Sequence, residues 1–235
     1  MNYSFWGYNM NYKNILVFDF ETTGVNSGLD EIIEIGAIQL ELIGNQYEVV
    51  DKLSVLIKQD KPLPPKITEI TGITDDILNE EGISRPLAFQ MFRNLYTPES
   101  LLIAYNIQFD IWFLINLFKK EEDPLFTIKN DVLDAMAVYK DFHAYPHRLE
   151  SALETYPVGV PNSHRALDDA TATYLLLKKM EETLPSTRNL DQFELKRYVN
   201  IIGQNPKYKV PFNQRLEGVQ YVDHWPNQML IYKKR

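Results

Sequence analysis

Two acidic residues follow an apolar run near the start of the chain. Residues 15–18 predict a buried central strand, and Asp19 and Glu21 come directly after them. Alternation along a strand puts both carboxylates on one face, roughly 7 Å apart. Two acids on one face of a core strand repel each other unless a cation lies between them, and Mg²⁺ and Mn²⁺ prefer such oxygen ligands. The pair indicates either a divalent-metal site or a strand end whose acids face water.

Two further acidic positions lie beside predicted core elements. Asp110 stands between a short apolar strand and an apolar helix, where its alternative role is to stabilise the start of that helix. For the neighbours Asp168 and Asp169, a rotation of about 100° per residue puts Asp169 with the apolar stripe of a helix and Asp168 on the outer flank. His164 lies about 140° from Asp169 on that helix, so we expect it to come from the first turn or the preceding loop, a position suited to a general base.

The elements that must position these residues predict an α/β fold. Strands come first, as an antiparallel meander, and strands then alternate with helices, which indicates a mixed sheet flanked by helices. Further strands are expected over 32–42, 47–57 and 101–105. Helical segments are expected over 74–78, 86–96, 111–118, 131–139, 148–156 and 166–184.

Three segments are expected along the chain. Residues 1–13 form an N-terminal extension, residues 14–185 the main domain, and residues 186–235 a C-terminal extension after Pro185. Within that extension we expect a helix over 190–202 and a β-hairpin over 219–232 that turns near Trp225-Pro226-Asn227.

Composition excludes several classes of protein. The 235 residues suit one substantial domain with an extension. There is no cysteine, which excludes disulfides and thiolate zinc sites, and the four histidines form no zinc motif. No apolar run reaches the ~18 residues of a membrane span, and residues 1–6 lack the regions of a signal peptide. We therefore expect a cytoplasmic protein that does not bind a membrane.

The net charge of −8 conceals an uneven distribution. Residues 1–185 hold 15 basic and 28 acidic side chains, whereas residues 186–235 hold 9 basic and 4 acidic ones. In the basic tail, cations alternate with aromatic residues, which is typical of a track for single-stranded nucleic acid. The alternative is that the aromatic residues pack on the acidic domain. Residues 228–232 resemble the clamp-binding peptides of bacterial replication proteins, although they also suit an ordinary strand. The aromatic residues are Phe193, Tyr198, Tyr208, Phe212, Tyr221, Trp225 and Tyr232.

Four motifs occur in an order that is far more specific than any one of them. Together they resemble the DEDDh (DnaQ-like) family of 3′-to-5′ exonucleases over about residues 14–184. Arg165 stands where the sister group has tyrosine, which indicates the histidine type, and Tyr105 departs from the histidine of many relatives. The motifs are Asp-x-Glu-Thr-Thr-Gly from Asp19, Ile-Thr-Gly-Ile from Ile70, Asn-x-x-Phe-Asp from Asn106 and His-x-Ala-x-x-Asp from His164.

The resemblance implies a ribonuclease H-like fold and a two-metal mechanism with two Mg²⁺ or Mn²⁺ ions per active site. By that resemblance Asp19 bridges both ions, Glu21 and Asp169 complete one site, and Asp110 holds the other ion. His164 then deprotonates the attacking water. The implied reaction is the release of nucleoside monophosphates from single-stranded DNA 3′ ends in proofreading or repair, with a polymerase or sliding clamp as a candidate partner.

Further residues are candidates for contact with the terminal nucleotide. For Phe20 and Phe109 a place in the core is an equal alternative, and for Ile70 and Ile73 a core role competes equally with a wedge between bases. Two other functions remain open: trimming of RNA 3′ ends, and a non-catalytic module that binds a polymerase or nucleic acid. The substrate candidates are Phe20, Thr22, Thr23, Gly24, Ile73, Asn106 and Phe109.

Overall fold

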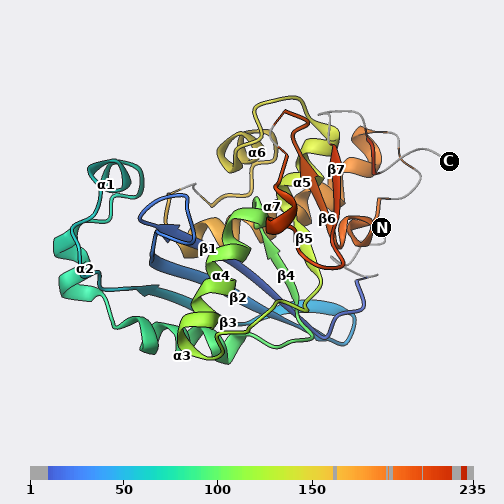
Figure 1. Cartoon of the computed structure of the whole chain (residues 1–235). Helices are drawn as coiled ribbons and strands as arrows, with labels where there is room; N and C mark the ends of the chain where they lie inside the picture. Colours follow the sequence, from blue (N-terminus) through green and yellow to red (C-terminus); the bar gives the residue numbers. More distant parts are fainter. Residues whose placement is uncertain are drawn as a thin grey trace.

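A five-stranded mixed sheet forms the centre of the computed structural model (Figure 1). Its strand order is β3-β2-β1-β4-β5; β1, β2 and β3 pair antiparallel, and β4 pairs parallel with β1 and β5. The predicted meander followed by parallel strands is therefore confirmed. The structure describes residues 10–160, 163–188, 190, 193–207, 209–223 and 229–231. The strands are β1 (Asn14–Thr22), β2 (Ile32–Ile43), β3 (Gln46–Leu56), β4 (Leu101–Ala104) and β5 (Val132–Asp134).

Helices cover both faces of this sheet. Because side chains alternate along β1, its residues contribute to a core on each face. Leu16 and Phe18 pack in one core with α3 and α4, whereas Ile15 and Val17 pack in a second core with α5, α6 and α7. None of the described helices is long and apolar enough to cross a membrane. The helices are α1 (Pro65–Thr71), α2 (Asp75–Glu81), α3 (Arg85–Leu95), α4 (Ile107–Glu121), α5 (Ala135–Phe142), α6 (Leu149–Thr155) and α7 (Ala166–Thr187).

The short helices α1 and α2 lie at one end of the sheet (Figure 1). Thr74 caps α2 by accepting a hydrogen bond from the Ile77 amide at 3.2 Å, as the predicted capped turn requires. Ile73, between the two helices, is 2 % exposed and belongs to a small separate core. Ile70 is 44 % exposed. The burial of Ile73 favours its role in the core. The exposure of Ile70 leaves this side chain accessible, as a wedge between bases requires.

The helix predicted over 131–139 is wrong at its start. Val132 and Leu133 instead form β5, because they complete the edge of the sheet beside β4. Asp134 then caps α5 by accepting a hydrogen bond from the Met136 amide at 3.1 Å.

The C-terminal extension docks on the β5 edge of the sheet. The Asn200 amide donates to the Val132 carbonyl at 2.7 Å. The extension contains a two-stranded sheet of β6 (Ile201–Gln204) and β7 (Gln220–Asp223), whose strands run parallel. The helix predicted over 190–202 is wrong in extent: the helical part described there is the 3-10 turn η1 (Leu195–Tyr198). The turn expected near residues 225–227 lies outside the described residues.

Some aromatic residues of the tail belong to the core. Phe193 and Tyr198 are buried beside α5 and α7, and the Tyr198 hydroxyl donates to Asp141 at 2.8 Å. Phe212 is 89 % exposed. Phe193 and Tyr198 therefore pack on the main domain, which is the alternative to a track for nucleic acid. Tyr208, Trp225 and Tyr232 lie outside the described residues. In the segment that resembles a clamp-binding peptide (residues 228–232), the amides of residues 229–231 donate to Asp141. The described part of this segment therefore lies against α5.

Candidate active site

The start of α7 lies directly over β2 at Gly36, the residue that pairs with Asp19 in β1. A Cβ at Gly36 would lie 2.0 Å from the backbone carbon of Ala166, so the approach requires glycine. This close packing brings the first turn of α7 beside β1. Asp169 is consequently near enough to Asp19 for its charge to raise the pKa of Asp19.

Glu34 anchors the same helix start. It pairs with Glu21 across the sheet and is fully buried. Its carboxylate accepts hydrogen bonds from Arg165 Nε and Nη2, at 3.0 and 2.8 Å to Oε1, and from the Ala166 amide at 3.1 Å. A negative charge at the N-terminus of a helix is favourable. Sequence reasoning missed Glu34, because only the strand register places it beside Glu21.

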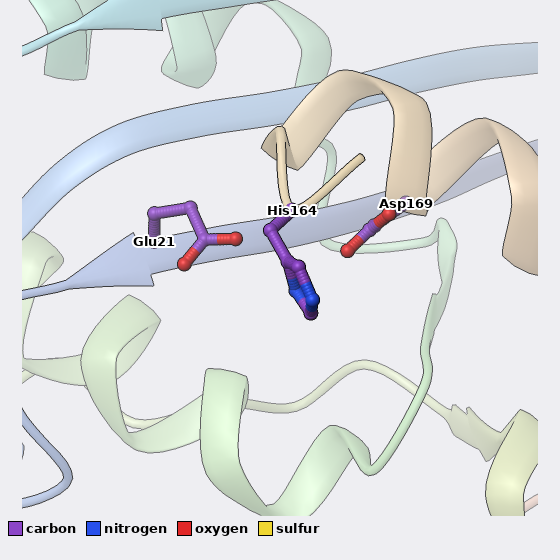
Figure 2. A group of neighbouring side chains, drawn as sticks. All are labelled: Glu21, His164 and Asp169. Atoms are coloured by element: carbon purple, nitrogen blue, oxygen red, sulfur yellow. The ribbon is translucent and has the colours of Figure 1, made fainter. Parts of the chain in front are cut away.

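Three of the predicted site residues converge on one space in Figure 2. Glu21 comes from the end of β1, Asp169 from the first turn of α7, and His164 from the segment just before it. One ligand atom of each lies within 4.8 Å of the others. His164 is exposed and has a φ of +50°, a left-handed conformation that is rare for residues other than glycine. The backbone thus holds its imidazole at the edge of the acidic cluster.

Asp110 reaches the same strand from α4. It lies in the first turn of α4, is 2 % exposed, and accepts a hydrogen bond from the Phe20 amide at 3.1 Å. That amide lies between Asp19 and Glu21 on β1. Asp110 is therefore fixed to the strand that carries the other two carboxylates, in addition to its place at a helix N-terminus.

The pKa values of four carboxyls in this cluster lie above their ordinary values. Burial raises the pKa of Asp19 to about 8, and repulsion by Asp169 and Glu34 adds to this. Burial, and then the charge of Asp19, raise the pKa of Glu21 to about 9. Burial raises the pKa of Asp169 to about 7, and burial followed by the charge of Asp19 raises the pKa of Asp110 well above its usual range.

A divalent cation fits these residues. Asp169 Oδ1 is buried and has no hydrogen-bond partner among the described residues, so a buried acceptor there is unused. The carboxylate oxygens of Glu21 and Asp169 meet here, and oxygen ligands suit hard divalent ions. A cation would also offset the repulsion that raises the carboxyl pKa values.

A cavity of about 780 Å³ lies along α4, the helix that carries Asp110. Its walls are the loop after β1 (residues 25–28), Phe109 and Trp112 of α4, and residues 209–214 of the tail. Trp112 Nε1 donates to the carbonyl of Gln214 at 3.1 Å, which fixes the tail against α4. The cavity is therefore built jointly by the main domain and the extension.

The other candidates for substrate contact lie in the core, in the loop after β1 or at the surface. Phe20 is 3 % exposed and packs among core aromatic rings, which favours its core alternative. Thr22 Oγ1 donates to the Gly24 carbonyl at 2.6 Å and Thr23 Oγ1 to Asp30 at 3.3 Å, so both hydroxyls brace the loop. Asn106 is exposed, with a φ of +64°, at the edge of the cavity.

Residues 16–177 match a family model described as Exonuclease (RNase_T). The matched range is more than half of the chain and contains all five acid and base positions predicted from the sequence. The chain belongs to this exonuclease family. The family resemblance inferred from the motifs is confirmed.

Relatives of this family member are much longer proteins. It is 34 % identical over 177 residues to the PolC-type DNA polymerase III of Clostridium perfringens, covering 72 % of the chain and 12 % of that protein. It is 31 % identical over 210 residues to the PolC-type DNA polymerase III of Thermotoga maritima, covering 87 % of the chain and 15 % of that protein. The chain thus spans under a sixth of either relative.

Solved structures share the fold. E. coli Exonuclease I in complex with a dT13 oligonucleotide superposes with a TM-score of 0.63 and 22 % identity, over 76 % of this chain and 43 % of that one. A product-bound exonuclease I structure gives a TM-score of 0.63 and 21 % identity, over 77 % of this chain and 46 % of that one. The predicted ribonuclease H-like architecture is confirmed.

Proposed function

We propose that this protein is a metal-dependent 3′-to-5′ exonuclease that releases nucleoside monophosphates from single-stranded DNA ends. The observation that supports it best is the convergence of Glu21, His164 and Asp169, whose ligand atoms lie within 4.8 Å of one another. Asp19 lies on β1, and Asp110 accepts a hydrogen bond from the amide of the next residue on that strand, Phe20. These five side chains come from β1, from α4 and from the start of α7. Because the three elements are far apart in the sequence, local sequence does not explain why their side chains meet.

Four carboxylates would hold two divalent ions, Mg²⁺ or Mn²⁺: those of Asp19, Glu21, Asp110 and Asp169. When bound, such ions polarise a phosphodiester and lower the pKa of a coordinated water. Asp19 is the candidate shared ligand, since it lies on β1 beside Asp169 and next to the amide that Asp110 accepts from. His164 takes the proton of the attacking water, because its imidazole is exposed at the edge of the cluster.

The cavity along α4 would take the terminal nucleotide. The Phe109 ring, which lines this cavity with Asn106, offers a stacking surface. The Thr22–Gly24 backbone leads directly into the loop over residues 25–28 that forms another wall. Phe109 is only partly buried, as a stacking residue must be. The proposed exonuclease domain is residues 14–185, and residues 186–235 form an extension that contributes one wall of this cavity.

The relatives suggest the substrate and the context. Exonuclease I is bound to a dT13 oligonucleotide in a structure of the same fold, and the relatives compared above are PolC-type DNA polymerases III. We infer that single-stranded DNA is the substrate and that the protein acts in replication or repair. A polymerase is the candidate partner. Bound divalent ions would offset the negative charge of the acidic main domain, which otherwise repels DNA.

The test is a nuclease assay with purified protein and 5′-labelled oligonucleotides. Single-stranded DNA should shorten stepwise from its 3′ end with Mg²⁺ or Mn²⁺ and remain intact with EDTA. The substitution Asp110→Asn should abolish the ladder, whereas Asp60→Asn, an exposed control of equal charge, should leave it unchanged. Equal rates on RNA would overturn the DNA preference, and shortening from the 5′ end would overturn the proposed polarity.

A further inference from the structure

A second cavity, of about 680 Å³, lies on the other side of Asn106. We name it the basic cavity, because Lys140, Arg148 and Lys207 line it and none of its described lining residues is acidic. The chain as a whole has a net charge of −8. Three cations without a described lining carboxylate contrast with this negative net charge, and such a cavity suits an anion.

Lys140 lies deepest in the basic cavity. It is 7 % exposed, and its ammonium makes one hydrogen bond within the described residues, to the Gly203 carbonyl at 3.4 Å. Burial lowers the pKa of Lys140, and the charge of the buried Asp134 opposes this. An ammonium carries three donors, and a buried donor without a partner is costly. Lys140 consequently has donors available for an anionic group in the cavity.

The mouth of the cavity is accessible and partly aromatic. Arg148 and Lys207 are exposed, and Tyr145 is 78 % exposed at the rim. The Tyr105 hydroxyl donates to the carbonyl of His147 at 2.9 Å, which holds the rim segment in place. Cations beside an exposed aromatic ring are the combination that binds phosphates and bases of single strands.

The basic cavity and the cavity along α4 share one lining residue. Asn106 lines both cavities and lies four residues before Asp110, at the start of α4. A strand whose last nucleotide occupies the first cavity can therefore pass Asn106 and enter the basic cavity. This places the basic cavity upstream of the bond that is cleaved.

We propose that the basic cavity binds an upstream nucleotide of the single strand, with Lys140, Arg148 and Lys207 facing its phosphodiester and Tyr145 its base. The inference rests on the proposed function, since the strand's direction comes from it. Lys207 belongs to the tail and Arg148 to the main domain. At this site the tail thus contributes one cation to substrate binding, while its residues Phe193 and Tyr198 are structural.

The test compares two double variants that lose the same charge. Arg148→Gln/Lys207→Gln removes the exposed cations of the basic cavity. Lys52→Gln/Lys178→Gln removes exposed cations that line neither cavity, one of them on β3 at the opposite edge of the sheet. Fluorescence anisotropy with labelled dT12, in Ca²⁺ to slow hydrolysis, gives the affinity between 50 and 400 mM salt. Thermal melting checks that both variants fold.

Each phosphate contact contributes a slope of about 0.7 to the dependence of log affinity on log salt. The cavity variant should lose a slope of about 1.4 and bind dT12 roughly 10–30-fold more weakly at 0.1 M salt, and its loss in kcat/KM should lie in KM. The control should match the wild type. A wild-type slope in the cavity variant, or an equal loss in the control, would overturn the assignment.

Two further comparisons separate the possible causes. The product dTMP carries the same phosphate chemistry, so its affinity is measured by competition with dT12. An equal loss for dTMP and dT12 in the cavity variant would show a product site and overturn the upstream assignment. The binding assay does not require hydrolysis. If the wild type fails to cleave DNA while the slope changes as expected, the proposed function fails and the cavity remains a single-strand site.

Discussion

Replacing Asp19 by asparagine should stabilise the metal-free protein while abolishing catalysis. Asp19 is partly buried on β1, with Asp169 and Glu34 close enough to repel it. Asparagine has nearly the same shape but carries no charge. The substitution therefore removes repulsion from the folded state and leaves the packing of β1 in place.

The pH dependence follows from the raised pKa of Asp19. Below about pH 3 the carboxyl is protonated in both the folded and the unfolded chain, so the raised pKa does not lower the stability of the fold. As the pH rises from the ordinary pKa of 3.8 to the folded pKa of about 8, the unfolded chain loses the proton that the folded chain keeps. The wild type therefore loses stability over this range, and the full loss is present above about pH 8.

The expected size of the effect is a few kcal/mol. A pKa that moves from 3.8 to about 8 corresponds to an upper limit of about 6 kcal/mol. Asp19, Glu21 and Asp169 repel one another, so neutralising one of them relieves only part of the repulsion. We expect Asp19→Asn to raise the free energy of unfolding by about 2–4 kcal/mol at pH 8.5. For a chain of 235 residues this corresponds to an increase in Tm of about 5–10 °C.

The assay is thermal unfolding in EDTA at pH 4.5 and 8.5, followed by melts with Mg²⁺ or Mn²⁺. Asp19→Asn should melt above the wild type at pH 8.5 and close to it at pH 4.5. Divalent ions should raise the Tm of the wild type and have little effect on the variant. Asp60→Asn, exposed and distant, serves as the charge control. A variant that melts at or below the wild type in EDTA at pH 8.5 would refute the reasoning.

Three further predictions test the site. Asp169→Ala should remove activity and Asp168→Ala should keep it within about twofold, because only Asp169 lies on the buried side of α7; the reverse pattern in the nuclease assay would show a wrong helix phase. His164→Ala should lower kcat by ~10²–10⁴-fold yet still bind metal, and calorimetry that shows lost metal binding would make His164 a ligand instead. Gly36→Ala should lower Tm and activity together, since the added methyl meets the α7 backbone at 2.0 Å, and an unchanged Tm in thermal melts would contradict that approach.

Local periodicity explains what could be predicted from the sequence. Alternation placed Asp19 and Glu21 on one face of a strand that the structure has in the same position. The helical period placed Asp169 on the side of α7 that carries Thr173 and Leu176, and all three are buried. These properties depend on residues within one element, so the sequence alone is sufficient for them.

The supports of the site depend on contacts between elements and were not predictable in this way. Glu34 reads as one polar residue in an apolar strand, and only its register with Glu21 and its hydrogen bonds to Arg165 reveal its role. Gly36 reads as an ordinary strand glycine until α7 is placed over it. Strand register and helix approach are tertiary properties, which one sequence without its partners does not specify.

Errors in element type have the same origin. Ile201 and Ile202 continued a helical spacing in the sequence, but docking beside β5 makes them the start of β6. Val132 and Leu133 likewise fall in a predicted helix but form β5, where they complete the sheet. In both cases β-branched or apolar residues at a sheet edge gain more from tertiary pairing than from local propensity.

The central claim is that the buried carboxylates hold divalent ions, and a Mn²⁺ titration tests it most directly. Calorimetry at pH 7.5 in two buffers with different ionisation enthalpies gives the number of ions bound and the number of protons released. We expect two ions per chain and the release of about one to two protons, because the pKa values of Asp19 and Glu21 are about 8 and about 9 without metal. Absence of binding, or binding that Asp19→Asn leaves unchanged, would contradict the account.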